Sequence, residues 1–294
     1  MSVHIVLATT PEQMDEVFRL RHRVFVEQEQ LLEARTDGRL MDRFDAFPST
    51  KILLVYSDGR AVGSVRMALD CEAGMPADAY YNFRAHAPVD ARLVHVGMLC
   101  IEKGYRNPRL TMHMLQMINY VSVSEGATHL AAPVNPAISR LLKRAGLHQV
   151  NEPFAEPGFN CLVVPLMMTL ADAKPIFSDF ARRNRQQDGL RNYERVFYEP
   201  GETVIRAGAT DDHTYVVIAG SARVALPGSE DNLGTLGEGD WFGEAALMGG
   251  EKRDRNVIAD TPLVLMRLRA DTLQQYRYHH SDEAERALID AEMP

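Results

Sequence analysis

The deciding stretch for the fold of the C-terminal part is Gly237-Glu238-Gly239-Asp240-Trp241-Phe242-Gly243-Glu244-Ala245-Ala246-Leu247, and Arg253 follows it. Glycines beside a short helical turn let backbone N–H groups approach an anion. A carboxylate such as Glu244 accepts hydrogen bonds from vicinal hydroxyls, and an arginine neutralises a phosphate with directional donors. The pattern therefore indicates a nucleotide site, and turn glycines with solvated charges are the alternative.

The sequence on both sides of this stretch is typical of a small antiparallel barrel or roll. Between residues 196 and 268, glycines and turn pairs recur every several residues, and short apolar strands such as 215–218 and 263–268 lie between them. Residues from 270 onward are predicted to be helical. We therefore expect a β-roll with flanking helices.

Residues 196 to about 290 resemble a cyclic-nucleotide-binding domain, the β-roll of bacterial catabolite activators and kinase regulatory subunits. The resemblance rests on Pro200-Gly201-Glu202, on residues 215–220, and on residues 242–247 with Arg253. It implies that cyclic AMP or cyclic GMP is bound as an effector. It also implies four contact residues, the first two at the ribose and the last two at the cyclic phosphate: Gly243, Glu244, Ala245 and Arg253.

The residues after Arg253 depart from this family, which usually has two small residues there. This chain has Asp254 and Arg255 instead. A carboxylate about 4 Å from a phosphate costs roughly 4 kcal/mol at an effective dielectric constant near 20. Alternation along a strand would turn Asp254 away and remove most of that repulsion. The sequence leaves both a binding pocket and a disabled one open.

Residues 1–168 are predicted to form a mixed α/β unit. Helices are expected at 11–28, 110–124 and 136–145, and strands at 51–56, 61–69, 93–101, 128–133 and 159–168. Ser57-Asp58-Gly59-Arg60 predicts a hairpin turn. Strands that alternate with helices favour a sheet covered on both sides.

Three segments of this unit carry charged residues next to apolar ones: 20–26, 41–66 and 99–107. An apolar strand, a loop with arginines and a helix N-terminus form a natural site for a pyrophosphate or a phosphopantetheine phosphate. For Arg21 and Arg23, surface ion pairs are the alternative.

Together these segments resemble the GNAT acyltransferase superfamily, and within it the autoinducer synthases and the long-chain N-acyl amino acid synthases. The resemblance rests on residues 20–25, on Asp42 and Asp45, on Arg66 and on residues 117–146. Such enzymes transfer a fatty acyl group from acyl carrier protein or coenzyme A to an amine. The resemblance implies that the catalytic residues include Arg21, Asp45 and Arg66, and that Arg66 orients the thioester or the acceptor carboxylate.

Two positions on the predicted strand 93–101 depart from the branch, which usually has a glutamate and an arginine there. This chain has His95 and Met98. A histidine with a pKa near neutral can take the proton of an amine, so His95 is the candidate catalytic base. A packed histidine in an enzyme that has lost its chemistry is the alternative.

The acyl donor is expected to bind at Ile101, Arg106 and Arg109. The coenzyme A loop of the superfamily reads Arg-x-x-Gly-x-Gly or Ala, whereas residues 106–111 lack both small residues. Acyl carrier protein therefore suits this loop better than acetyl-coenzyme A. Its acidic face would dock on basic residues, for which the candidates are Arg106, Arg109, Lys143 and Arg144.

The composition of the 294 residues excludes several classes of protein. Apolar residues make up 46% and charged residues 24%, as in ordinary proteins with hydrophobic cores, and the formal net charge is -8, which disfavours nucleic acid and anionic membranes. No apolar run is long enough to span a bilayer and no secretory signal is visible, so a cytoplasmic protein is expected. The three cysteines are expected to be reduced thiols: Cys71, Cys100 and Cys161. Neither a metal site nor a tightly bound cofactor is expected.

We therefore expect an α+β protein with a GNAT-like domain at 1–168, a connecting helix at 169–195 and a cyclic-nucleotide-binding-like domain at 196–294. The expected function is transfer of a fatty acyl group from acyl carrier protein, or from acyl-coenzyme A, to a small amine such as an amino acid. Regulation by a cyclic nucleotide is expected. Two alternatives remain: a non-catalytic sensor of a cyclic nucleotide or an acyl group, and a protein lysine acetyltransferase gated by cyclic AMP.

Overall fold

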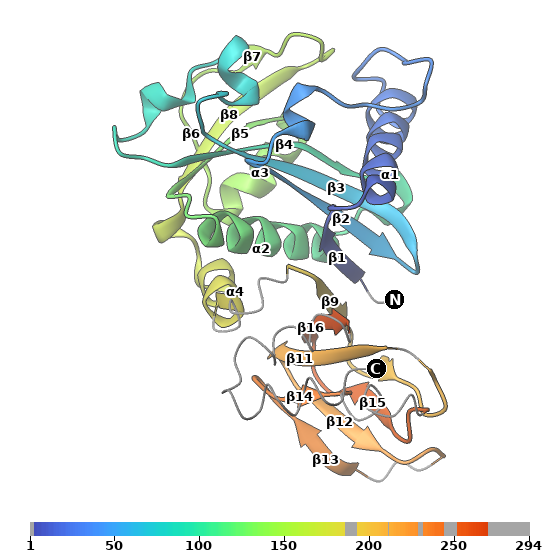
Figure 1. Ribbon diagram of the computed structural model, residues 1–294. Coiled ribbons are helices and arrows are strands. Elements are labelled where there is room, and N and C mark those ends of the chain that lie inside the picture. The colour runs from blue at the N-terminus through green and yellow to red at the C-terminus, as the bar shows by residue number, and fades with distance from the viewer. Residues whose placement is uncertain (1–2, 186–192, 211, 229–231, 244–251, 270–294) are drawn as a thin grey trace, which may run out of the picture. The chain divides into compact units, whose positions relative to one another are not determined.

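The computed structural model describes residues 3–185, 193–210, 212–228, 232–243 and 252–269. The chain folds into two compact units, one of residues 5–186 and one that joins residues 1–4 to residues 187–294 (Figure 1). The boundaries expected at 168/169 and 195/196 stay a prediction. Helix α4 (Pro175–Arg185), from the segment expected to connect the domains, packs on helix α2 (Pro108–Ser124) of the first unit.

The first unit is built around a mixed sheet with the strand order β1-β2-β3-β4-β5-β8-β6, and β7 pairs with β8. Only the β4–β5 pair of this sheet is parallel among the pairs described in register. Its strands are β1 (Val3–Leu7), β2 (Thr50–Ser57), β3 (Arg60–Leu69), β4 (Leu93–Ile101), β5 (His129–Val134), β6 (His148–Gln149), β7 (Phe154–Ala155) and β8 (Leu162–Thr169). The predicted hairpin joins β2 to β3, with φ of 49° at Asp58 and 76° at Gly59.

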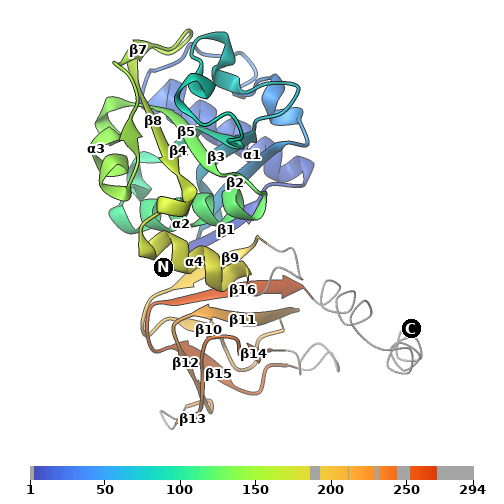
Figure 2. The ribbon, with the colours of Figure 1, turned by 90° about the vertical axis from the view of Figure 1, so that its left-hand side faces the viewer.

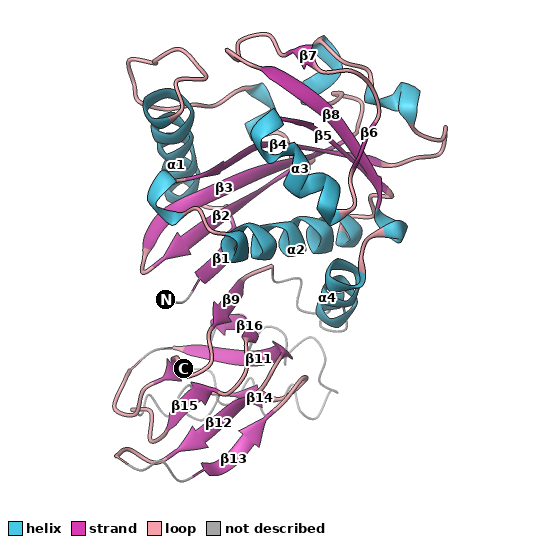
Figure 3. Ribbon diagram, turned by 180° about the vertical axis from the view of Figure 1, so that it is seen from behind, coloured by secondary structure: helices cyan, strands magenta, loops and turns pink. Residues whose placement is uncertain are grey.

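The helices of this unit begin where the sequence provides a capping residue. Thr10 caps helix α1 (Pro11–Arg21) in a reciprocal capping box with Gln13. Asparagines cap α2 and helix α3 (Pro136–Ala145), which ends at Gly146 with φ of 120°. Figure 3 shows α2 and α3 in front of the strands.

Helix α1 does not continue as an α-helix to residue 28. Its last turn passes into a π-helix, His22–Gln28, in which Val24 and Phe25 are buried. These side chains and those of Val17 and Leu20 pack on Ile52 and Leu54 of β2. Arg66 of β3 pairs in register with Ile52, so its side chain lies on the sheet face that α1 covers.

Strand β4 carries a bulge next to a gap in the sheet. Arg66 pairs with Gly97 and Ser64 with Cys100, so β4 has one extra residue there, and Met98 has a left-handed φ of 52°. The register of β4 with β5 runs only from Leu93 to His95. In the described structure the two strands therefore part after His95, and the backbone of β4 beyond it faces a gap rather than β5.

The second unit consists of two antiparallel sheets, in the orders β14-β11-β16-β9 and β10-β15-β12-β13 (Figure 2). The strands are β9 (Arg195–Tyr198), β10 (Thr203–Ile205), β11 (His213–Ala219), β12 (Ala222–Ala225), β13 (Asn232–Leu236), β14 (Trp241–Phe242), β15 (Asn256–Ala259) and β16 (Leu263–Arg269). Tyr215, Phe242 and Leu265 pack in the core between them. This architecture confirms the predicted fold class, although the helix expected from residue 270 lies outside the described residues.

Two further features bear on the sequence-based expectations. The cysteines are free thiols, with Cys71 exposed and Cys100 buried. In the described part of the chain, no helix has both the length and the apolar character that a membrane span requires.

Candidate active site and nucleotide pocket

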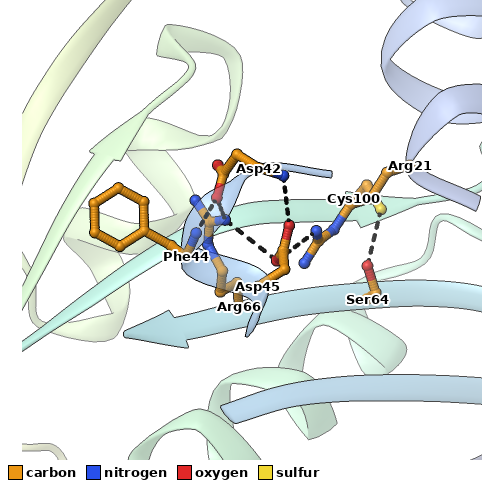
Figure 4. Close-up of polar contacts among 7 residues, drawn as sticks. All are labelled: Arg21, Asp42, Phe44, Asp45, Ser64, Arg66 and Cys100. Atoms are coloured by element: carbon orange, nitrogen blue, oxygen red, sulfur yellow. Dashed lines mark hydrogen bonds and ion pairs between the residues drawn. The ribbon is translucent and has the colours of Figure 1, made fainter. Parts of the chain in front are cut away.

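Four charged residues, Arg21, Asp42, Asp45 and Arg66, meet on the α1 side of the sheet, and we call them the charged cluster (Figure 4). Arg21 ends α1 and Arg66 lies on β3. Asp42 is the N-cap of a 3-10 helix, Arg43–Ala46, and Asp45 is the third residue of that helix. Arg21 Nη1 lies 2.8 Å from Asp45 Oδ1. Arg66 Nη1 lies 2.6 Å from Asp42 Oδ1 and 3.2 Å from Asp45 Oδ1.

The backbone of the 3-10 helix fixes both carboxylates. Asp42 Oδ1 accepts a hydrogen bond from the N–H of Phe44 at 2.8 Å, and Asp45 Oδ2 accepts one from the N–H of Asp42 at 2.9 Å. Because each carboxylate is bound to the backbone as well as to an arginine, the orientation of the Arg66 guanidinium is determined by the local fold.

Three of these side chains are almost completely buried: Arg21 is 0% exposed, Arg66 2% and Asp45 4%. Burial raises the pKa of Asp45, but attraction to Arg21 and Arg66 and the hydrogen bond from Asp42 outweigh burial and hold the pKa below its ordinary value. Asp45 is therefore ionised at neutral pH. Its negative charge is shared between the two arginines.

A cavity of about 510 Å³ opens at the gap between β4 and β5. Its polar wall consists of Asp42, Arg43, Arg66, Tyr80, His95, Asn135, Glu156 and Cys161. Most of the remaining wall is apolar and includes Leu115, Ile118, Leu130, Ala132, Val134, Ile138, Leu142 and Val163.

The structure brings the predicted residues Arg66 and His95 together in this cavity. Arg21 and Asp45 are not among the described lining residues; Arg21 pairs with Asp45, and Asp45 pairs in turn with Arg66. Of the four predicted catalytic residues, Arg66 and His95 therefore line the cavity, whereas Arg21 and Asp45 lie behind Arg66. Catalytic roles for Arg21, Asp45 and Arg66 stay predictions. In the described part of the chain, no group of three or more His, Cys, Asp or Glu residues could hold a metal ion.

His95 is buried, and neither ring nitrogen has a hydrogen-bond partner among the described residues. Burial and the nearby charge of Arg66 lower the pKa of His95 to about 3. The expectation that His95 titrates near neutral pH is therefore wrong, because the sequence does not show that the ring is buried. Its role as the catalytic base stays a prediction from the sequence.

The predicted donor residues gather where β4 leads into α2. The carbonyl of Ile101 accepts a hydrogen bond from Arg106 Nε at 2.9 Å, and Arg106 Nη2 lies 2.7 Å from Glu29 Oε1. Arg109, in the first turn of α2, donates to His113 Nε2 at 3.3 Å. Binding of the acyl donor at these residues stays a prediction.

The polar wall also contains two residues that the sequence did not single out, Tyr80 and Glu156. Tyr80 Oη donates a hydrogen bond to Glu156 Oε1 at 2.8 Å across 76 positions of sequence. Burial raises the pKa of Glu156 more than Tyr80 and Arg66 lower it. No local pattern marks either residue, because each gains its place only through the packing of distant segments.

In the second unit, Arg253 is buried and donates hydrogen bonds to the backbone carbonyls of Gly243 and His213. Gly243 has φ of 93°, and a Cβ there would lie 3.1 Å from both Arg253 Nη1 and the His213 carbonyl oxygen, so a glycine is required. Asp254 is 82% exposed and pairs with Arg255 at 3.2 Å. Both residues precede strand β15, so strand alternation, which would turn Asp254 away from Arg255 as well as from Arg253, does not apply to them. The predicted contacts Glu244 and Ala245 lie outside the described residues.

Comparison with known proteins assigns the first unit. Residues 16–169, slightly more than half of the chain, match the family model "N-acyl amino acid synthase FeeM". The chain belongs to this FeeM family. The solved structure of FeeM from uncultured soil microbes is 14% identical and has a TM-score of 0.50, with 58% of this chain and 92% of that chain covered, so the likeness shows a shared fold.

The second unit matches a family model other than that of the first unit. Residues 195–279 match the cyclic nucleotide-binding domain model. A cAMP-dependent protein kinase regulatory subunit of Yarrowia lipolytica is 37% identical over 103 residues, which are 34% of this chain and 27% of that protein. A cGMP-dependent protein kinase of Drosophila melanogaster is 40% identical over 74 residues, 24% of this chain and 10% of that protein. This chain thus spans about a quarter or less of these relatives, and the predicted resemblances of both domains are confirmed.

Proposed function

We propose that this protein transfers a fatty acyl group from a thioester donor to the amine of a small acceptor such as an amino acid. The observation that carries the proposal is the cavity between β4 and β5, which combines a long apolar wall with the fixed cation Arg66. An acyl chain gains about 0.8 kcal/mol for each buried methylene group in such an environment. The same unit carries the FeeM-family match.

The bulge in β4 suits the reacting end of the donor. Beyond His95 the backbone of β4 faces the gap, so its N–H groups are placed to bind amides of a pantetheine arm or the carbonyl of the thioester. Arg66 would then orient the carboxylate of the acceptor. The charged cluster prevents the guanidinium from turning away.

Acyl carrier protein is the donor that we propose first. It would dock an acidic face on the basic side chains near the start of α2 and the end of α3, where Arg109 and Lys143 are exposed. The absence of both small residues from 106–111 supports this choice over acetyl-coenzyme A. A cyclic nucleotide bound at Arg253 would regulate the transfer.

The direct test uses the full chain with palmitoyl-acyl carrier protein, or with palmitoyl-coenzyme A, and a mixture of the twenty amino acids. Mass spectrometry of the products is expected to show an N-palmitoyl amino acid. Acetylated peptides from acetyl-coenzyme A would favour a protein acetyltransferase instead. If palmitoyl donors yield no amide, the proposed function is wrong, and donor binding without turnover would indicate a sensor.

Arg66→Lys is expected to lower kcat/KM for this transfer by about 10²-fold, the usual effect of losing substrate orientation. Lysine keeps a positive charge beside Asp45 but lacks the planar fork of arginine. Arg19→Lys is the matched control, because Arg19 pairs with Asp15 on the surface and is not a described cavity residue. Full turnover by the Arg66 variant would show that this residue does not orient either substrate.

Ala132→Leu is expected to shorten the preferred acyl chain. Ala132 is buried on β5 and lines the cavity, so three added carbon atoms would take space from the end of a long chain. The ratio of kcat/KM for palmitoyl to that for octanoyl donors should fall about tenfold, as for the loss of one or two buried methylenes. Retained octanoyl transfer would confirm that the variant folds. An unchanged ratio would show that the acyl chain does not bind beside Ala132.

A further inference from the structure

Acyl transfer to an amine requires a group that takes a proton from nitrogen, and the polar wall of the cavity limits the choice. Asp42 is paired with Arg66, and Asp45 is paired with both arginines of the charged cluster. His95 has a pKa of about 3, so it accepts a proton poorly. Glu156 is the remaining carboxylate among the described lining residues.

The position of Glu156 is fixed by its neighbours. The residue follows β7, where the Phe154 ring stacks on Tyr81 with centroids 4.7 Å apart and an angle of 7°, and lies 5.8 Å from the Tyr80 ring. Tyr80 then donates to Glu156 Oε1. This packing ties the segment after β7 to the segment around residue 80, so the carboxylate keeps its direction without an ion pair.

One oxygen of Glu156 remains available. Oε1 is bound by Tyr80, whereas Oε2 has no hydrogen-bond partner among the residues that the structure describes. The ionisable groups that act on this carboxylate or share its wall come from separate elements, and no described ion pair joins Glu156 to a cation among them: Tyr80, Arg43, Arg66, Asp42, His95 and Cys161. Partial burial makes Glu156 a stronger proton acceptor than an exposed glutamate, since its pKa is raised.

We propose that Glu156 takes the proton that the acceptor amine loses during acyl transfer, and that Tyr80 holds its carboxylate in position. The inference rests on the proposed function. The amine nitrogen attacks the carbonyl carbon of the thioester, the nitrogen–carbon bond forms, and the carbon–sulfur bond breaks with its electron pair on sulfur. The nitrogen proton moves to Glu156 Oε2 and then to the thiolate. The products are an amide and a free thiol, and the carboxylate is restored.

This placement also limits the acceptor. Arg66 and Glu156 present a cation and a carboxylate to the same cavity. An α-amino acid carries the complementary pair, a carboxylate for Arg66 and an amino group for Glu156. A simple alkylamine would lack the first contact, so it should be a poorer acceptor than an amino acid.

Glu156→Gln is the main test, with the palmitoyl donor and amino acid mixture described above. The substitution keeps the shape and removes the proton acceptor, so kcat is expected to fall about 10²- to 10⁴-fold. The rise of kcat/KM with pH through the Glu156 pKa should disappear. Glu152→Gln is the matched control, because Glu152 is an exposed glutamate four positions earlier.

Tyr80→Phe separates positioning from proton transfer. The Tyr80 hydrogen bond lowers the pKa of Glu156, so its removal raises that pKa. The acidic limb of the pH profile, which is the rise of kcat/KM through the Glu156 pKa, should therefore move to higher pH. Turnover above the limb should fall less than in Glu156→Gln. An unmoved limb would show that Tyr80 does not act on the catalytic group.

The outcomes distinguish the inference from the proposed function. Absence of amide from the wild type contradicts the function, whereas an active wild type with an unchanged rate and limb in Glu156→Gln contradicts only the Glu156 assignment. A limb that disappears in His95→Gln and persists in Glu156→Gln would assign the proton to His95. A titration by carboxyl carbon NMR needs no turnover, and a Glu156 pKa at or below the ordinary 4.5 would also overturn the assignment.

Discussion

Asp45→Asn is expected to lower the free energy of unfolding of the first unit by about 3–5 kcal/mol, the usual effect of breaking a buried ion pair. The variant would leave Arg21, which is 0% exposed, and Arg66 without the carboxylate that both contact. Urea unfolding followed by circular dichroism measures this change. Trp241 is the only tryptophan of the chain and lies in the second unit, so its fluorescence reports whether that unit is unaffected.

The same variant gives a pH dependence with a definite sign. Folding lowers the pKa of Asp45, so its stabilising contribution is present above the pKa of the unfolded chain, about 3.9, and is lost as pH falls through the folded value. The difference between wild type and Asp45→Asn should therefore be full above about pH 5 and shrink below it. Asp15→Asn removes an exposed pair and should have a much smaller effect. Equal stability of wild type and Asp45→Asn would contradict the assigned role of the cluster.

Arg253→Ala is expected to weaken cyclic AMP binding by about 2–5 kcal/mol, or roughly 30-fold to several thousand-fold, as for removal of one partner of a buried charge pair. Arg253 is buried and oriented by the carbonyls of Gly243 and His213, so its cation is held beside the glycine that the resemblance places at the ribose. Isothermal titration calorimetry with cyclic AMP and cyclic GMP measures the loss. Arg223→Ala is the control, because Arg223 pairs with Asp260 on the surface of the same unit.

Asp254→Ser completes this experiment. The side chain of Asp254 is 82% exposed, so its removal is expected to change the affinity less than Arg253→Ala does. Tight binding by Asp254→Ser together with no binding by the wild type at millimolar nucleotide would identify a disabled pocket. The second unit would then have no nucleotide-dependent role.

The local features of the fold were predictable because each depends on a few neighbouring residues. Thr10 with Pro11 marks the start of α1, Asp58-Gly59 gives the hairpin, and Gly146 ends α3. The π-helix at His22–Gln28 was not predicted, because its side chains keep nearly helical spacing and only the backbone differs. Residue identity along one segment does not show this change.

The candidate site was predictable only where a family resemblance joined distant segments. It grouped Arg21, Asp45 and Arg66, which the structure brings into contact. It did not reveal that His95 is buried beside Arg66, or that Glu156 meets Tyr80. Both facts depend on how segments that are distant in the sequence pack together, and the sequence of a single segment does not show that packing.

The left-handed Met98 has a consequence for protein engineering. A side chain in this conformation costs roughly 1–2 kcal/mol, which glycine would avoid, and the extra residue breaks the regular pairing of β4. A search for thermostable variants would therefore tend to select glycine at position 98 or deletion of one residue of the bulge. Deletion would align β4 for continuous pairing and narrow the gap that the cavity occupies. Stabilisation of this domain should leave residues 97–99 unchanged, because regular pairing of β4 would reduce the volume of the cavity.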